Sequence, residues 1–206
     1  GDYNTAIGQH ALACNTTGLH NVGIGYQALF CNTTGSQNYA IGYLAMASAS
    51  GNYNVGIGNY VMDAAMNGAT GNTALGYSSL SEITTGNSNI AIGRRAGRVL
   101  ATGGGNTAVG NDCLYASTDV DNTVIIGSDA CTAVLTSAAD GTVAIGSQAL
   151  TSLTSGARNL AIGYGAMDAL TQGDDNIGIG VDALGAMATT DGNDKNIAIG
   201  SYALAN

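Results

Sequence analysis

The sequence predicts an all-β protein, a parallel β-solenoid or β-roll built from twelve short coils. Three observations lead to this prediction. The phrase N-x-A-I-G-x-x-A-L recurs twelve times in 206 residues, at spacings of 16 to 20 residues. Its composition disfavours helices, because Asn, Thr, Val, Ile and Gly are poor helix formers at this density. The commonest spacing of 17 residues is also too short for helical repeats, which need roughly 33 residues or more.

Each copy of the repeat is anchored on one glycine, which we number position 0. Position −1 is Ile in ten copies, position −4 is Asn in ten, and position +4 is Leu or Met in ten. No insertion falls between −4 and +4, so this part is the stacked core, and the looser stretch after it, rich in TTG and SG, is a surface turn. The anchoring residues are Gly8, Gly25, Gly42, Gly58, Gly76, Gly93, Gly110, Gly127, Gly146, Gly163, Gly180 and Gly200.

The elements of one coil follow from this pattern. Positions −4 to −1 are expected to form a short strand, the glycine to turn the chain, and the Ala-Leu pair at +3 and +4 to begin a second strand. Twelve coils stacked at ~4.8 Å make a rod of ~58 Å. The asparagine amides at −4 are then expected to hydrogen-bond along the rod. Residues 1–206 form a single repeat domain.

The strand has two faces, because alternate residues point to opposite sides. Positions −3 and −1 share one face, which we expect to fill the core. Position −2 lies on the other face and is Ala or Gly in eleven of twelve copies, which favours close approach of another chain. The alternative is that the small side chains fill a flattened interior of a monomer. The candidate inter-chain packing residues are Ala40, Ala74, Ala91, Ala108 and Ala161.

Composition limits the possible partners. Only 9% of the residues are charged, against roughly 25% in a typical soluble domain. The net charge is −9, and the basic residues cluster only at Arg94, Arg95 and Arg98. Binding to nucleic acid through its phosphates is therefore excluded. No apolar run approaches the ~20 residues of a membrane span, so no membrane insertion is expected. Because the chain begins and ends within the repeat, we expect a segment of a longer fibre.

Several copies resemble a known family. The clearest are NTAIGQHAL (4–12), NVGIGYQAL (21–29), NIAIGRRAG (89–97) and NIAIGSYAL (196–204). They resemble the head repeats of trimeric autotransporter adhesins and, more closely, repeats of phage tail-fibre-like and bacterial surface attachment proteins. The resemblance implies a left-handed parallel β-roll with three chains around one axis. It also implies an extracellular or virion-surface location and attachment to a host cell or surface through a glycan or protein.

Three functions remain open at this point. The first is a structural and adhesive segment of a trimeric attachment fibre, and the second is a purely structural extracellular filament with binding located elsewhere. An ice-binding solenoid is the third, although the paired Thr residues lie in turns and are missing from most coils. We expect no enzyme, because no catalytic set stands out from the repeat. No cofactor or metal is expected either, because the four Cys residues lack zinc-site spacing.

Exposed aromatic residues are the candidate recognition residues. Aromatic rings suit sugar stacking or protein contact, although they can also shield the edge of the roll. Recognition is further expected in the longest connections, at 136–142 and 188–195, because loops on a rigid scaffold carry variation and binding. The tyrosines that share position +1 are Tyr26, Tyr43, Tyr77 and Tyr164, and Tyr60 and Tyr202 lie at +2.

Two further features have alternative interpretations. Cys14 and Cys31 are 17 residues apart, which puts their Cα atoms ~4.8 Å apart and within reach of a disulfide. A stacked pair of buried thiols is favoured instead, because parallel neighbours point their Cβ atoms the same way. The Asp-rich loops, such as GDDN at 173–176, suit either a cation or a solvated turn.

Overall fold

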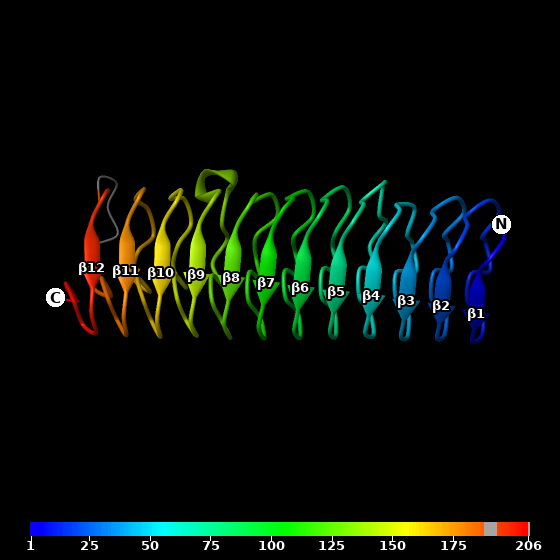
Figure 1. Cartoon of the computed structure of the whole chain (residues 1–206), viewed down its shortest axis with the longest axis horizontal. Helices are drawn as coiled ribbons and strands as arrows, with labels where there is room; N and C mark the ends of the chain where they lie inside the picture. Colours follow the sequence, from blue (N-terminus) through cyan, green and yellow to red (C-terminus); the bar gives the residue numbers. More distant parts are fainter. Residues whose placement is uncertain (188–192, 206) are drawn as a thin grey trace.

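The protein is a rod of stacked coils in a computed structural model that describes residues 1–187 and 193–205 (Figure 1). Each coil contributes one strand of three residues, and the strands form one parallel sheet in sequential order. The predicted all-β solenoid is confirmed. The strands are β1 (Thr5–Ile7), β2 (Val22–Ile24), β3 (Tyr39–Ile41), β4 (Val55–Ile57), β5 (Thr73–Leu75), β6 (Ile90–Ile92), β7 (Thr107–Val109), β8 (Val124–Ile126), β9 (Val143–Ile145), β10 (Leu160–Ile162), β11 (Ile177–Ile179) and β12 (Ile197–Ile199), and a 3-10 turn, η1 (Ser137–Ala139), lies between β8 and β9.

The coils stack in register. Gly23 pairs with Ala40 between β2 and β3, and Ala74 pairs with Ala91 between β5 and β6. The glycine at position 0 ends every strand, and at Gly25 its φ is 131°. A Cβ atom added there would overlap the carbonyl oxygen of the equivalent glycine in the next coil. Both the positive φ and the close stacking therefore require glycine at this position.

The asparagines at −4 form the predicted ladder. The backbone N–H of Asn89 donates to Oδ1 of Asn72 at 2.9 Å, and its Nδ2 donates to the carbonyl oxygen of Gly103 at 2.8 Å. Oδ1 of Asn89 in turn accepts the backbone N–H of Asn106 at 2.9 Å. These side chains are buried, and a buried polar group is stable only when it is hydrogen-bonded. The ladder thus fixes the register of each coil on the next.

The second strand predicted at +3 and +4 is wrong. In the described residues this segment is a series of turns in which positions +2 and +4 have positive φ, 52° at Gln27 and 54° at Leu29. A left-handed conformation costs a leucine roughly 1–2 kcal/mol, so residue preference did not predict it. Hydrogen bonds between coils offset the cost, from the N–H of Leu29 to the carbonyl of Ala45 at 3.0 Å and from the N–H of Gln27 to that of Gln9 at 2.9 Å.

The inner and outer faces of the strand are the reverse of those predicted. The small residues at −2 are buried inside the single chain, whereas the Ile residues at −1 lie on the outer face. The interior is filled by the Leu or Met at +4, since a Cβ atom added at Gly23 would lie 3.3 Å from Cγ of Leu12. Only Ala, Gly and one Ile occupy −2. The candidate inter-chain residues Ala40, Ala74, Ala91, Ala108 and Ala161 are 0 to 2% exposed, so the prediction that they pack between chains is wrong.

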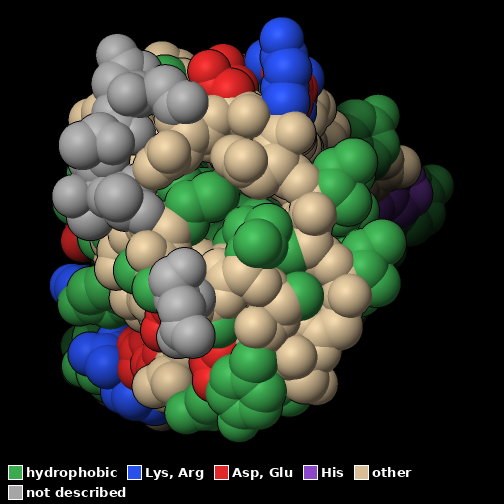
Figure 2. All heavy atoms as spheres, turned by 90° about the vertical axis from the view of Figure 1, so that its left-hand side faces the viewer, with side chains coloured by type: hydrophobic (Ala, Val, Ile, Leu, Met, Phe, Trp, Pro, Cys, Tyr) green, Lys and Arg blue, Asp and Glu red, His purple; other side chains and the backbone are tan. Residues whose placement is uncertain are grey.

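The end of the rod at β12 leaves part of the core uncovered. In an end-on view from this side, apolar side chains gather near the middle of the terminal coil (Figure 2). Leu204, at the interior position +4, is 63% exposed there. A terminal strand also presents unpaired backbone groups along one edge. The last coil is therefore held by fewer contacts than the inner coils.

Candidate functional site

The outer face of the sheet is a continuous apolar strip. Positions −3 and −1 point outward along all twelve strands, and they carry Ile, Val, Leu, Thr or Tyr. Several of these side chains are more than a third exposed, including Ile41, Leu75, Ile90 and Ile92. The strip is ~58 Å long and about 10 Å wide from the stacking and rise of its strands, or roughly 580 Å². That area is at the upper end of the apolar patches that monomers expose, so the strip has the character of an interaction surface.

A row of aromatic rings follows the turn glycine in four successive coils. The rings of Tyr26 and Tyr43 stack with centroids 5.2 Å apart, Tyr60 follows at 5.3 Å, and Tyr77 follows Tyr60 at 5.8 Å. The structure thus brings three of the four predicted tyrosines together and adds Tyr60. Tyr164 follows β10, five coils further along, and is exposed. The constant 17-residue spacing of the four tyrosines in this row is the signal that identifies Tyr60.

The arginine cluster follows β6 and joins three coils. Arg94 and Arg95 contact the carboxylate of Asp112 at 2.6 and 2.5 Å. Burial raises the pKa of Asp112, but the hydrogen bond from Arg95 and the charges of both arginines bring it below its ordinary value. The guanidinium groups of Arg95 and Arg98 also lie 5.0 and 5.7 Å from the ring centroid of Tyr115, within cation–π range. The only basic residues that cluster in the sequence are therefore engaged within the chain.

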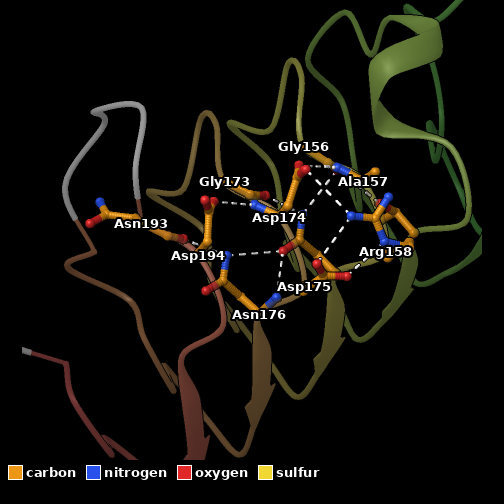
Figure 3. A network of polar contacts seen from close by, with 11 residues as sticks. Gly156, Ala157, Arg158, Gly173, Asp174, Asp175, Asn176, Asn193 and Asp194 are labelled. Atoms are coloured by element: carbon orange, nitrogen blue, oxygen red, sulfur yellow. Dashed lines mark hydrogen bonds and ion pairs between the residues drawn. The ribbon is translucent and has the colours of Figure 1, made fainter.

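The acidic loops near β10 to β12 are cross-linked turns (Figure 3). Oδ1 of Asp174 accepts the N–H of Ala157 at 2.9 Å, and the N–H of Asp174 donates to Asp194 at 2.8 Å. Arg158 contacts Asp175 at 2.7 Å, and its hydrogen bond lowers the pKa of that carboxyl. No cluster of three or more metal-binding side chains occurs within 1–187 and 193–205. These loops hold neighbouring coils together through hydrogen bonds and an ion pair.

The cysteines divide into two pairs. Cys14 and Cys31 are free and exposed, so the expectation of buried stacked thiols is wrong as to burial. Burial and the neighbouring Cys14 raise the pKa of Cys31. Cys113 and Cys131 are free and buried, and burial raises the pKa of Cys113 to about 12. Burial also raises the pKa of Cys131, so Cys31, Cys113 and Cys131 are thiols and not thiolates at neutral pH.

Of the two longest connections, the structure describes the first fully and the second only in part. Residues 136–142 include η1 (Ser137–Ala139), in which Ala139 is buried. Most of the second predicted recognition loop, residues 188–192 of 188–195, lies outside the described residues. In the part of the chain that is described, no helix is long and apolar enough to cross a membrane. Comparison with models of protein families, curated proteins and solved structures finds no match to this chain.

Proposed function

We propose that this chain is a structural and adhesive segment of a homotrimeric attachment fibre on a virion or cell surface. It binds a host cell or surface through a glycan or protein. The observation that carries the proposal is the apolar strip along the outer face of the sheet. A surface of this size and composition is stabilised when it is buried. The repeats resemble those of attachment fibres, and this resemblance supports the view that a second and a third copy of the same chain cover the strip.

The proposal corrects the surface at which the chains meet. The alanines at −2 are interior residues, so the contact between chains is assigned to the Ile and Val residues at −1 and −3. Three strips around one axis would enclose a second hydrophobic core that runs the length of the rod. Such a core is long and free of charge, and it stiffens the fibre. The turns and the aromatic row would then face outward, where a host surface can reach them.

The test is the mass of the protein in solution. Light scattering should give about three times the single-chain mass of 20.3 kDa. Ile92→Lys should lower that mass to a single chain, because it buries a charge in the proposed interface. Gln148→Lys adds the same charge on the return segment, by which we mean the turns at positions +1 to +6 after each strand. Gln148 is exposed there, so this variant should leave the trimer intact. A monomeric parent protein, or an Ile92→Lys variant of full trimeric mass, would contradict the proposal.

The purely structural filament and the adhesive fibre lead to different expected results in one experiment only. Both require the oligomer, but only the adhesive fibre requires binding by this segment. Purified trimer should therefore be tested on host cells and on immobilised glycans. Binding supports the adhesive fibre, and a stable trimer without binding supports the shaft. The ice-binding alternative loses support from the outer face, because only Thr5, Thr73 and Thr107 occupy position −3 as threonine.

A further inference from the structure

A groove of about 470 Å³ crosses the return segments after β4, β5 and β6. Pockets for small ligands are typically ~300–1,000 Å³, so the groove has room for one or two sugar rings. None of its lining residues belongs to the apolar strip, so the groove is separate from the proposed contact between chains. The residues that line it are Tyr60, Asp63, Ala64, Tyr77, Ser78, Ser81, Glu82 and Arg98.

The groove departs from the repeat in its chemistry. Its lining residues occupy positions +1, +2, +5 and +6, with Ser78 and Ser81 buried and Tyr77 and Glu82 exposed. At +5 and +6, three successive coils place Asp63, Glu82 and Arg98 side by side. Of the 14 acidic residues, only three precede Asp112, and two of these three line this groove. The carboxylates therefore gather here and not evenly along the first half of the rod.

The aromatic rings at the groove are arranged differently from the rest of the row. Tyr26 and Tyr43 stack at an interplanar angle of 11° and cover each other's faces. Tyr60 and Tyr77 meet at 75°, so the edge of one ring points at the other and the two faces do not cover each other as in a stacked pair. Tyr77 is 51% exposed. An uncovered aromatic face beside hydrogen-bonding groups suits the apolar face of a sugar ring.

The charges of the groove favour an uncharged ligand over an anion. Arg98 is held by Glu82 at 3.5 Å and by the hydroxyl of Tyr115, to which it donates at 2.8 Å. Asp63 takes no part in that ion pair. Burial and the charge of Glu82 raise the pKa of Asp63, and Arg98 opposes this. Two carboxylates against one guanidinium leave the groove with a net negative charge, which repels anionic ligands. Carboxylates are acceptors only and bind hydroxyl groups strongly.

We infer that this groove binds an uncharged glycan, with a sugar ring against Tyr60 and Tyr77 and its hydroxyl groups donating to Asp63 and Glu82. Ser78 and Ser81 supply further hydroxyl contacts at the floor. The inference rests on the adhesive part of the proposed function and names its ligand class. The groove is complete within one chain. A failure of glycan binding and a failure of trimer formation are therefore measured separately.

The experiment uses the full chain and two kinds of probe. Binding of cellotetraose and chitotetraose is measured by calorimetry, beside a sialic acid oligomer and a heparin tetrasaccharide as anionic probes. At least one uncharged probe should bind, and the anionic probes should not. Tyr77→Ala and Asp63→Asn should each weaken binding about tenfold or more, because each removes a stacking face or a charged acceptor. Tyr164→Ala is the matched control, since it removes a tyrosine at the same repeat position outside the groove, and should bind like the parent.

Circular dichroism and light scattering are recorded for each variant, so that loss of binding is read only from folded protein of parental mass. The inference is overturned if neither uncharged probe binds, or if an anionic probe binds more tightly. It is also overturned if Tyr77→Ala and Asp63→Asn bind like the parent, or if Tyr164→Ala loses binding equally. A trimer that binds no uncharged probe overturns the groove assignment alone. A monomer that binds the probes overturns the fibre proposal alone.

Discussion

Replacing Ala91 by Leu tests which face of the strand is inside. Ala91 is fully buried in β6, between the equivalent alanines of β5 and β7 in register. Those neighbours lie ~4.8 Å away along the rod, so the larger side chain has no room in either direction. Its interior neighbours include the turn at Gly97, where an added Cβ atom would lie 3.9 Å from Cβ of Ala91. Overpacking of a filled core costs about 1–3 kcal/mol, and we expect the upper end of that range.

The assay is thermal unfolding followed by circular dichroism, with light scattering at low temperature. A loss of ~3 kcal/mol corresponds to a fall in Tm of roughly 6–12 °C for a chain of this length. The control is Ile92→Leu, a change of shape at the adjacent outward position, which should move Tm little. If Ala91→Leu unfolds at the parental temperature but loses oligomeric mass, the alanines face another chain and the assignment of the faces is refuted.

Three further predictions concern the ladder, the ion pair and the thiols. Asn89→Ala should destabilise the protein by about 3 kcal/mol, because two buried backbone groups lose their partners. Asn89→Thr should cost less, since threonine occupies the same position in two other coils; equal losses would contradict the ladder's role. Asp112→Asn should lower the free energy of unfolding at pH 7, where the carboxylate with its lowered pKa is charged. Because that contribution disappears as pH falls through the folded pKa, the two proteins should converge in stability at low pH, and a constant difference would contradict the ion pair. Cys14 and Cys31 should react with a thiol reagent in the folded protein, and the two buried cysteines only after unfolding; four fast thiols would refute this burial.

The architecture could be predicted from the sequence because its strongest constraints act on the backbone. Gly25 and its equivalents need positive φ and close stacking, and no other residue meets both requirements. Asn89 and its equivalents satisfy buried backbone groups in the next coil. Both requirements recur in each coil, so both appear in the sequence as repeated letters at a fixed spacing. The number of strands and their order follow directly from that spacing.

The orientation of the strand could not be predicted from alternation alone, because both faces are apolar. Alternation separates −1 from −2 but does not say which lies inside. The deciding fact is that the Leu or Met at +4 fills the interior, as Leu12 does beside Gly23. One signal for this was present in the sequence. Position −3 holds Tyr39, Thr5 and Ile90 in different coils, and a narrow stacked core does not accept side chains of such different size.

The left-handed conformation at +2 and +4 could not be predicted from the local preferences of the residues at these positions. Leu29 and Gln27 adopt positive φ because the backbone hydrogen bonds between coils require it, not because the residues favour it. The same requirement explains the aromatic row. Tyr60 lies at +2 in its coil and its neighbours lie at +1, but all four keep a spacing of 17 residues and meet in space.

Charge separates the two outer surfaces of the coil, and this separation bears on the function. None of the 19 charged side chains of the chain, five basic and 14 acidic, occupies position −3 or −1 in any of the twelve copies. A surface that faces water along its whole length has no reason to exclude charge, whereas a surface covered by another chain does, because an unpaired buried charge is costly. Asp63, Glu82 and the three clustered arginines all lie on the return segment instead. Under the proposed function, assembly uses the apolar strip and recognition uses the return segment. Substitutions at Tyr77 or Asp63 should then alter binding without altering the mass of the oligomer, and substitutions at Ile92 should do the reverse.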